Sequence, residues 1–138
     1  MKKVMCFGTF DLVHLGHIRY FQQAKGFGDY LIVVIARDAT KHDQKKNIIF
    51  SEEERLELIK NIHLVDEAVL GNEEDHLKIV EEKKPDIICL GYDHLFKEKE
   101  LAERLAQRGL YPEIKRMKPY QVERHKTSII RKKVLTEN

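Results

Sequence analysis

The sequence has little of several features that would define a specialised class of protein. Its 138 residues include only two cysteines, Cys6 and Cys89, whose number excludes a disulfide framework and whose spacing matches no zinc site. Both lie in apolar runs, so we expect buried, free thiols. No apolar stretch approaches the length of a membrane span, and the N-terminus lacks the apolar segment of a signal peptide. We therefore expect a cytoplasmic protein with no membrane partner.

An excess of charge of one sign is also absent. Lys and Arg number 25 against 23 Asp and Glu, for a net charge of +2, so nothing in the composition calls for a nucleic acid partner. Proline and glycine are few, and there is no repeat, low-complexity segment or linker. An apolar fraction of 42% and a charged fraction of 35% are typical of a soluble globular chain. Residues 1–138 are predicted to form a single domain.

Short apolar runs alternate along the chain with segments of helical periodicity. We predict strands over Val4–Phe7, Tyr30–Ala36, Glu67–Leu70, Asp86–Leu90 and Glu113–Met117. Predicted helices cover Leu15–Lys25, a segment opening at Ser51 with a capping box to Glu54, Asp75–Lys84, Lys97–Gln107 and Thr127–Leu135. Alternating strands and helices indicate an α/β fold with a doubly wound, mostly parallel, five-stranded sheet.

Ligands of such folds bind beyond the carboxyl ends of the strands. Three connections are therefore candidate sites: Gly8–His17, Gly91–Asp93 and Lys118–Lys126. In the first, Gly8 permits a tight turn, and a helix beginning near Leu15 points free N–H groups at a phosphate. His14 and His17, three residues apart, can donate hydrogen bonds to phosphate oxygens, and Gly16 between them leaves room for a nucleoside. These residues indicate a phosphate site without specifying a reaction.

The same turn resembles a known family. Gly8-Thr9-Phe10-Asp11 followed by His14-Leu15-Gly16-His17 is similar to the cytidylyltransferase-like nucleotidyltransferases, which have a Rossmann-like fold and a His-x-Gly-His motif. Later segments are closer to the archaeal-type FAD synthases of this family: Ala36-Arg37-Asp38, Lys84-Pro85-Asp86-Ile87-Ile88 and Leu90-Gly91-Tyr92-Asp93. The terminal Arg124 to Ser128 segment lacks the Gly-Ile core of the corresponding motif in the cytidylyltransferases, which favours the FAD synthases.

The resemblance implies roles for individual residues. His14 and His17 would be catalytic, holding the triphosphate and stabilising charge on the α-phosphate. The nucleotide would also contact Thr9, Phe10, Leu15, Gly16, Asp93 and Tyr120. Candidates for binding the triphosphate or the acceptor phosphate are Lys46, Arg55, Arg124, Thr127 and Ser128. The alternatives are a solvated position for Lys46 and Arg55, a helix cap for Thr127 and Ser128, and a rim aromatic for Tyr120.

The implied reaction is transfer of AMP from ATP to FMN, giving FAD and pyrophosphate. One alternative is a glycerol-3-phosphate cytidylyltransferase or a relative that forms CDP-glycerol from CTP, and another is a non-catalytic nucleotide-binding module. The acceptor is an ionised phosphate monoester, so no strong general base is required. No residue is predicted to bind a metal directly, and we expect Mg²⁺ held mainly by substrate phosphates. The predicted assembly is a homodimer.

Overall fold

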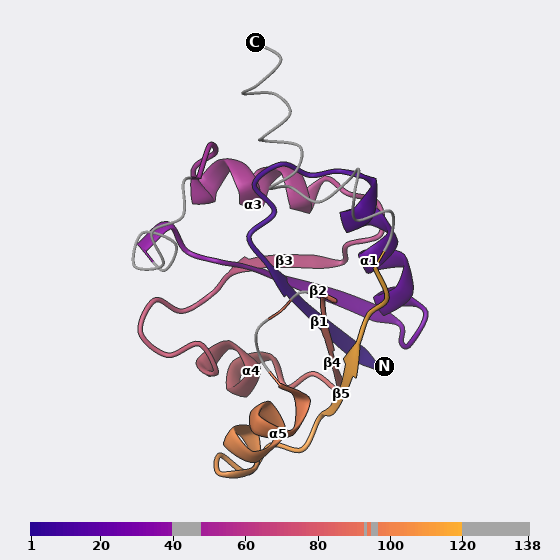
Figure 1. The fold of residues 1–138 in the computed structure, drawn as a ribbon, viewed down its shortest axis with the longest axis vertical. Helices are drawn as coiled ribbons and strands as arrows, with labels where there is room; N and C mark the ends of the chain where they lie inside the picture. The colour runs from indigo at the N-terminus through magenta and orange to yellow at the C-terminus, as the bar shows by residue number, and fades with distance from the viewer. Residues whose placement is uncertain (40–47, 93, 95–96, 120–138) are drawn as a thin grey trace.

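Five parallel strands form one sheet within the part of the chain that the structure describes. This computed structural model describes residues 1–39, 48–92, 94 and 97–119. The strands are β1 (Lys3–Gly8), β2 (Tyr30–Ile35), β3 (Glu67–Leu70), β4 (Ile87–Leu90) and β5 (Glu113–Arg116). Their order across the sheet is β3-β2-β1-β4-β5, and every neighbouring pair is parallel (Figure 1). The five predicted strands are confirmed, each to within one residue at either end.

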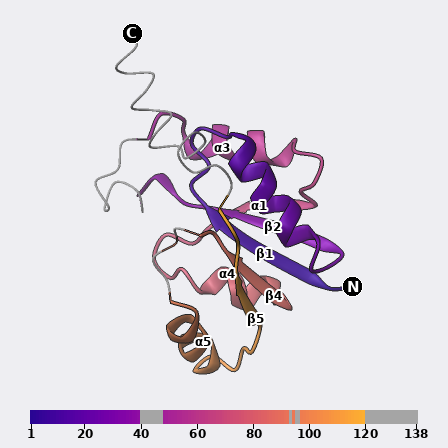
Figure 2. The same cartoon turned by 45° about the vertical axis from the view of Figure 1, so that its right-hand side comes forward.

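Helices cover both faces of this sheet. Helices α1 (Leu15–Lys25) and α3 (Glu52–Lys60) lie on one face, and α4 (Lys78–Lys83) and α5 (Glu98–Ala106) lie on the other (Figures 1 and 2). Each face carries its own apolar cluster: Phe21 of α1 packs with Val33, whereas Leu105 of α5 packs with Ile32, the preceding residue of β2. Successive residues of a strand point to opposite faces, so a strand covered on both faces is apolar throughout.

The helix ends follow local signals at some positions and not at others. The predicted capping box is present, because the Ser51 side chain accepts from the Glu54 amide and Glu54 accepts from the Ser51 amide. The predicted start of α4 at Asp75 is wrong by three residues. There the Asn72 side chain accepts from the Asp75 amide and the Asp75 side chain from the Leu77 amide, so the chain forms turns before the helix begins. The predicted helix at 127–135 lies outside the described residues.

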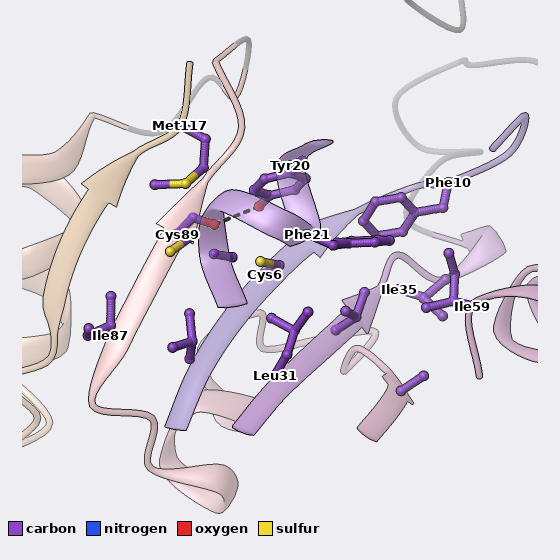
Figure 3. Close-up of a cluster of buried hydrophobic side chains, with 14 residues drawn as sticks. Cys6, Phe10, Tyr20, Phe21, Leu31, Ile35, Ile59, Ile87, Cys89 and Met117 are labelled. Carbon is purple, nitrogen blue, oxygen red and sulfur yellow. Dashed lines mark hydrogen bonds between the residues drawn. The ribbon is translucent and has the colours of Figure 1, made fainter. Parts of the chain in front are cut away.

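Strands β1 and β4 are no longer paired at their carboxyl ends. The β1–β4 register runs from Val4 opposite Ile87 to Cys6 opposite Cys89, whereas β1 pairs with β2 as far as Gly8. Beyond Cys89 the Tyr20 hydroxyl bridges the strands, accepting from the Phe7 amide at 3.3 Å and donating to the Cys89 carbonyl at 2.6 Å (Figure 3). The crossovers from β1 and to β4 also run on opposite faces, so this is the topological switch point of the sheet.

The two cysteines lie opposite each other on the paired strands β1 and β4. Cys6 and Cys89 are both free and fully buried, as predicted, and burial raises the pKa of Cys6. The hydrogen bond with Cys6 lowers the pKa of Cys89. Because both side chains are closed to solvent, we nevertheless expect neither thiol to react with a disulfide reagent on the timescale of mixing in the native protein. Denaturation in guanidinium should release two reactive thiols. Rapid labelling of either cysteine without denaturant would contradict this placement.

Candidate functional site

The turn between β1 and α1 is closed by two histidines that cap the helix. His14 is the N-cap, and its Nδ1 accepts from the Gly16 amide at 3.0 Å. His17, three residues on, uses its own Nδ1 to accept from the His14 amide at 3.2 Å. This is a capping box in which imidazoles replace the usual hydroxyl and carboxylate. Since Nδ1 is the acceptor in both rings, the proton of each neutral ring is on Nε2.

The pair therefore supplies two hydrogen-bond donors of fixed orientation. The ring centroids of His14 and His17 are 4.0 Å apart. Desolvation of the His17 ring, together with the neighbouring His14, lowers the pKa of His17 to about 3. His17 is thus neutral near pH 7 and acts as a donor without carrying a formal charge. The amides of Gly16 and His17 in the first turn of α1 already donate to His14. The positive end of the helix dipole lies beside the histidine pair, an arrangement suited to phosphate.

The low pKa of His17 predicts acid sensitivity. As the pH falls below 6.5 the unfolded chain binds a proton on His17 that the folded chain does not bind until about pH 3. This contribution to the free energy of unfolding is present above pH 6.5 and is lost towards pH 3, by at most about 1.4 kcal/mol per pH unit. Urea titrations at several pH values should show a steeper decline for the wild type than for His17→Gln. Parallel declines would show that His17 titrates normally.

The Phe10 side chain packs against His17 in the interior of the protein. Its backbone is in the left-handed region, with φ at 55°, and its side chain is only 3% exposed. The ring meets His17 edge-on at 5.3 Å, and a Cβ on Gly8 would lie 2.5 Å from the Phe10 ring. The nucleotide contact by Phe10 stays a prediction, and the packing of its ring against His17 leaves the backbone of Phe10 as the part that a ligand can reach. The absence of a side chain at Gly8 is needed for the close approach of this ring.

Arg55 also differs from its predicted role as a phosphate ligand. Its side chain is fully buried in α3 and donates four hydrogen bonds within the chain. The acceptors are the carbonyl oxygens of Phe50, Thr9 and Ala36, at 3.2, 2.9 and 2.8 Å, and the Asp38 carboxylate. A guanidinium has five N–H donors, so almost all of its donor capacity is used inside the protein. Arg55 joins the exits of β1 and β2, which is a structural role.

Asp11 is a second residue whose role the motif alone does not reveal. It is 2% exposed, and its two carboxylate oxygens accept from the amides of Ile49 and Phe50, each at 2.8 Å. Asp11 and Arg55 thereby tie the segment that precedes α3 to the histidine turn. A signal for Arg55 existed in the sequence, since it lies four and seven residues before Ile59 and Ile62, on the apolar stripe of its helix.

The remaining predicted residues divide into two groups. Thr9, Leu15 and Gly16 are partly or largely accessible around the start of α1, consistent with contact to a ligand there. The others lie outside the described residues: Lys46, Asp93, Tyr120, Arg124, Thr127 and Ser128. Across residues 1–39, 48–92, 94 and 97–119, no three His, Cys, Asp or Glu side chains are grouped to hold a metal ion. None of the helices described there has the length and apolarity to cross a membrane.

Known proteins share this sequence and fold. Residues 5–133 match the Cytidylyltransferase-like family. The FAD synthase of Thermoplasma volcanium is 45% identical over 98% of this chain and 95% of its own length, and that of Ferroglobus placidus is 47% identical over 86% and 77%. A crystal structure from Thermoplasma volcanium, described as a lipopolysaccharide core biosynthesis protein, superposes with a TM-score of 0.86 at 47% identity, over 88% of this chain and 99% of that one.

The family match over residues 5–133 includes the histidine turn. An Archaeoglobus fulgidus protein of unknown function, at 15% identity and a TM-score of 0.69, shares the fold. The five parallel strands, the switch point beside β1 and the histidine-capped helix agree with the match over residues 5–133. The chain therefore belongs to the cytidylyltransferase-like family and is a nucleotidyltransferase.

Proposed function

We propose that this nucleotidyltransferase transfers AMP from ATP to FMN, forming FAD and pyrophosphate. The observation that carries the transferase chemistry is the pair of Nδ1-anchored histidines, His14 and His17, at the switch point and at the start of α1. The choice of ATP and FMN is supported by the relatives named FAD synthase, two of which match at least 98% of this chain at 44% and 45% identity.

The chemistry is an in-line displacement at the α-phosphorus of ATP. A phosphate oxygen of FMN forms the new P–O bond while the bond from the α-phosphorus to the bridging oxygen breaks, and pyrophosphate leaves with that electron pair. Negative charge is spread over the α-phosphate oxygens in the transition state. The Nε2–H groups of His14 and His17 donate to this charge from fixed positions, so they need little reorganisation as it develops. The attacking phosphate is already ionised, so the step does not require a general base.

A divalent cation fits this site as a companion of the substrate. Asp11, the carboxylate nearest to the histidines in the sequence, is occupied by two backbone amides, and the described residues offer no cluster of acidic ligands. Mg²⁺ commonly retains waters and binds through substrate phosphates. We propose that Mg²⁺ is held in this way, with the triphosphate as its main ligand, and that it neutralises the leaving pyrophosphate.

An isoalloxazine ring requires an apolar platform close to the phosphates. Asp11 fixes the backbone of Phe50 beside the histidine turn, and Tyr92, after β4, is 37% exposed. These two rings, one on each side of the β1 exit, are the platform candidates among the described residues.

The test is an incubation of the protein with Mg²⁺ and each pair of substrates, with products resolved by chromatography. FAD and pyrophosphate from ATP and FMN would support the proposal. CDP-glycerol from CTP and glycerol 3-phosphate, without FAD, would show that the acceptor is glycerol 3-phosphate and that the nucleotide base is cytosine. Nucleotide binding without any pyrophosphate release would indicate a binding module in place of an enzyme.

Two further proposals concern the cellular location and the oligomeric state of the protein. We propose a cytoplasmic homodimer, in keeping with small, soluble substrates and with the prevalence of twofold assemblies. Light scattering coupled to size-exclusion chromatography tests the dimer, since a mass near 16.3 kDa would show a monomer.

A further inference from the structure

In the turn after β4, Gly91 and His94 are held together by two hydrogen bonds. The His94 amide donates to the Gly91 carbonyl at 3.2 Å, and the Gly91 amide donates to His94 Nδ1 at 3.0 Å. A Cβ on Gly91 would lie 3.1 Å from His94 Nε2, so the ring of His94 occupies the space that a larger residue at position 91 would need. The backbone of Gly91 and the side chain of His94 are therefore packed together.

Arg116, at the end of β5, clamps this turn from outside. Its Nη1 donates to the carbonyl of Gly91 at 2.9 Å and to the carbonyl of His94 at 2.8 Å. The other side of the guanidinium is held by Glu98, the first residue of α5, through Nε at 3.2 Å and through Nη2. One side chain thus fixes both ends of the turn relative to β5 and α5.

The clamped turn borders the switch point. Gly91 follows β4 directly, and β4 is the neighbour of β1, which leads into the histidine turn. The ring of His94 meets Tyr20 edge-on, with centroids 6.1 Å apart, and Tyr20 bridges the ends of β1 and β4. A nucleotide bound in this crevice lies between the histidine turn on one side and the Gly91–His94 turn on the other.

We propose that Arg116 is a positioning residue for the nucleoside triphosphate, acting through the Gly91–His94 turn without touching the ligand. This inference rests on the proposed function, according to which ATP binds at the switch point. A turn shaped before binding spares the nucleotide the cost of ordering it. Loss of the clamp should therefore weaken nucleotide binding, whereas the FMN site and the charge stabilisation by His14 and His17 depend on other elements.

The test compares Arg116→Lys with Arg108→Lys. Arg108 is a matched control because its side chain is 30% exposed, against 28% for Arg116. Within the described residues, the Arg108 side chain donates to the carboxylates of Asp75 and Glu81 and to no backbone carbonyl. The lysine ammonium lacks the planar set of N–H donors with which Arg116 binds both carbonyls and Glu98 at once. We expect Arg116→Lys to raise the KM for ATP about tenfold, with kcat and the KM for FMN within about twofold of wild type. Arg108→Lys should leave all three unchanged.

Calorimetric titration with a non-hydrolysable ATP analogue gives a second readout that does not depend on FAD formation. If the wild type makes no FAD, the proposed function fails, and the calorimetric comparison still decides the role of Arg116. An unchanged affinity for the analogue, or equal changes in the two KM values, would overturn the inference. If Arg116→Lys does not fold, Gly91→Ala, which disturbs the same turn through His94, replaces it and must show the same selective loss of ATP affinity.

Discussion

Replacing His17 with alanine is expected to lower kcat about a hundredfold or more while changing nucleotide affinity little. His17 offers an Nε2–H donor whose orientation is fixed by the bond from the His14 amide to Nδ1 and by the edge-on contact with Phe10. A donor held in place before the reaction stabilises the charge that develops in the transition state more than the charge of the bound substrate. Removing one such donor typically costs about 10²- to 10³-fold in kcat.

Two variants separate this effect from damage to the helix. Glutamine at position 17 can keep the capping box, since its side-chain oxygen can accept from the His14 amide. We expect His17→Gln to retain a Tm close to that of the wild type and a reduced kcat. His76→Ala, at an exposed histidine preceding α4, should behave as wild type. Turnover near normal in His17→Ala, measured as FAD formed at saturating ATP and FMN, would refute the role of this imidazole.

Arg55→Met is expected to lower the free energy of unfolding by about 3 kcal/mol or more. Methionine can fill much of the space of the buried side chain but donates nothing. The carbonyls of Thr9, Ala36 and Phe50 would then lose a charged donor, and buried carbonyls without partners are costly. Urea denaturation followed by circular dichroism measures the loss. Arg37→Met is the control. Arg37, like Arg55, forms ion pairs with carboxylates, in its case those of Glu52 and Glu73, but its side chain is 29% exposed.

The same variant distinguishes the two roles considered for Arg55. A structural residue predicts lost stability, with activity falling in line with the folded fraction. A phosphate ligand predicts nearly unchanged stability and a selective rise in the KM of ATP or FMN. An Arg55→Met protein as stable as the wild type, with weakened substrate binding, would restore the role predicted from the sequence.

The elements and the histidine turn could be predicted because their signals are local. Runs such as Leu31–Ile35 are apolar at every position, which is typical of a strand covered on both faces. The extent of α1 follows from its apolar spacing and from the glycines that come after it, and α3 begins at the Ser51 capping box. The two histidines of the first turn are three residues apart, so their shared position at a helix start needs no distant partner.

The contacts of Phe10, Arg55 and Arg116 were decided only by the tertiary structure. Arg55 meets carbonyls of residues 9, 36 and 50, and Arg116 meets those of residues 91 and 94, which come together only when strands β1, β2, β4 and β5 pair. An arginine in a sequence is equally suited to a phosphate and to backbone carbonyls, since both accept hydrogen bonds. Burial distinguishes the two, and burial depends on which segments the sheet brings alongside. The sequence by itself therefore determined the strands and the histidine turn, on which the predicted phosphate site rests. The packing of distant segments determined which arginines are bound to backbone carbonyls beside that turn.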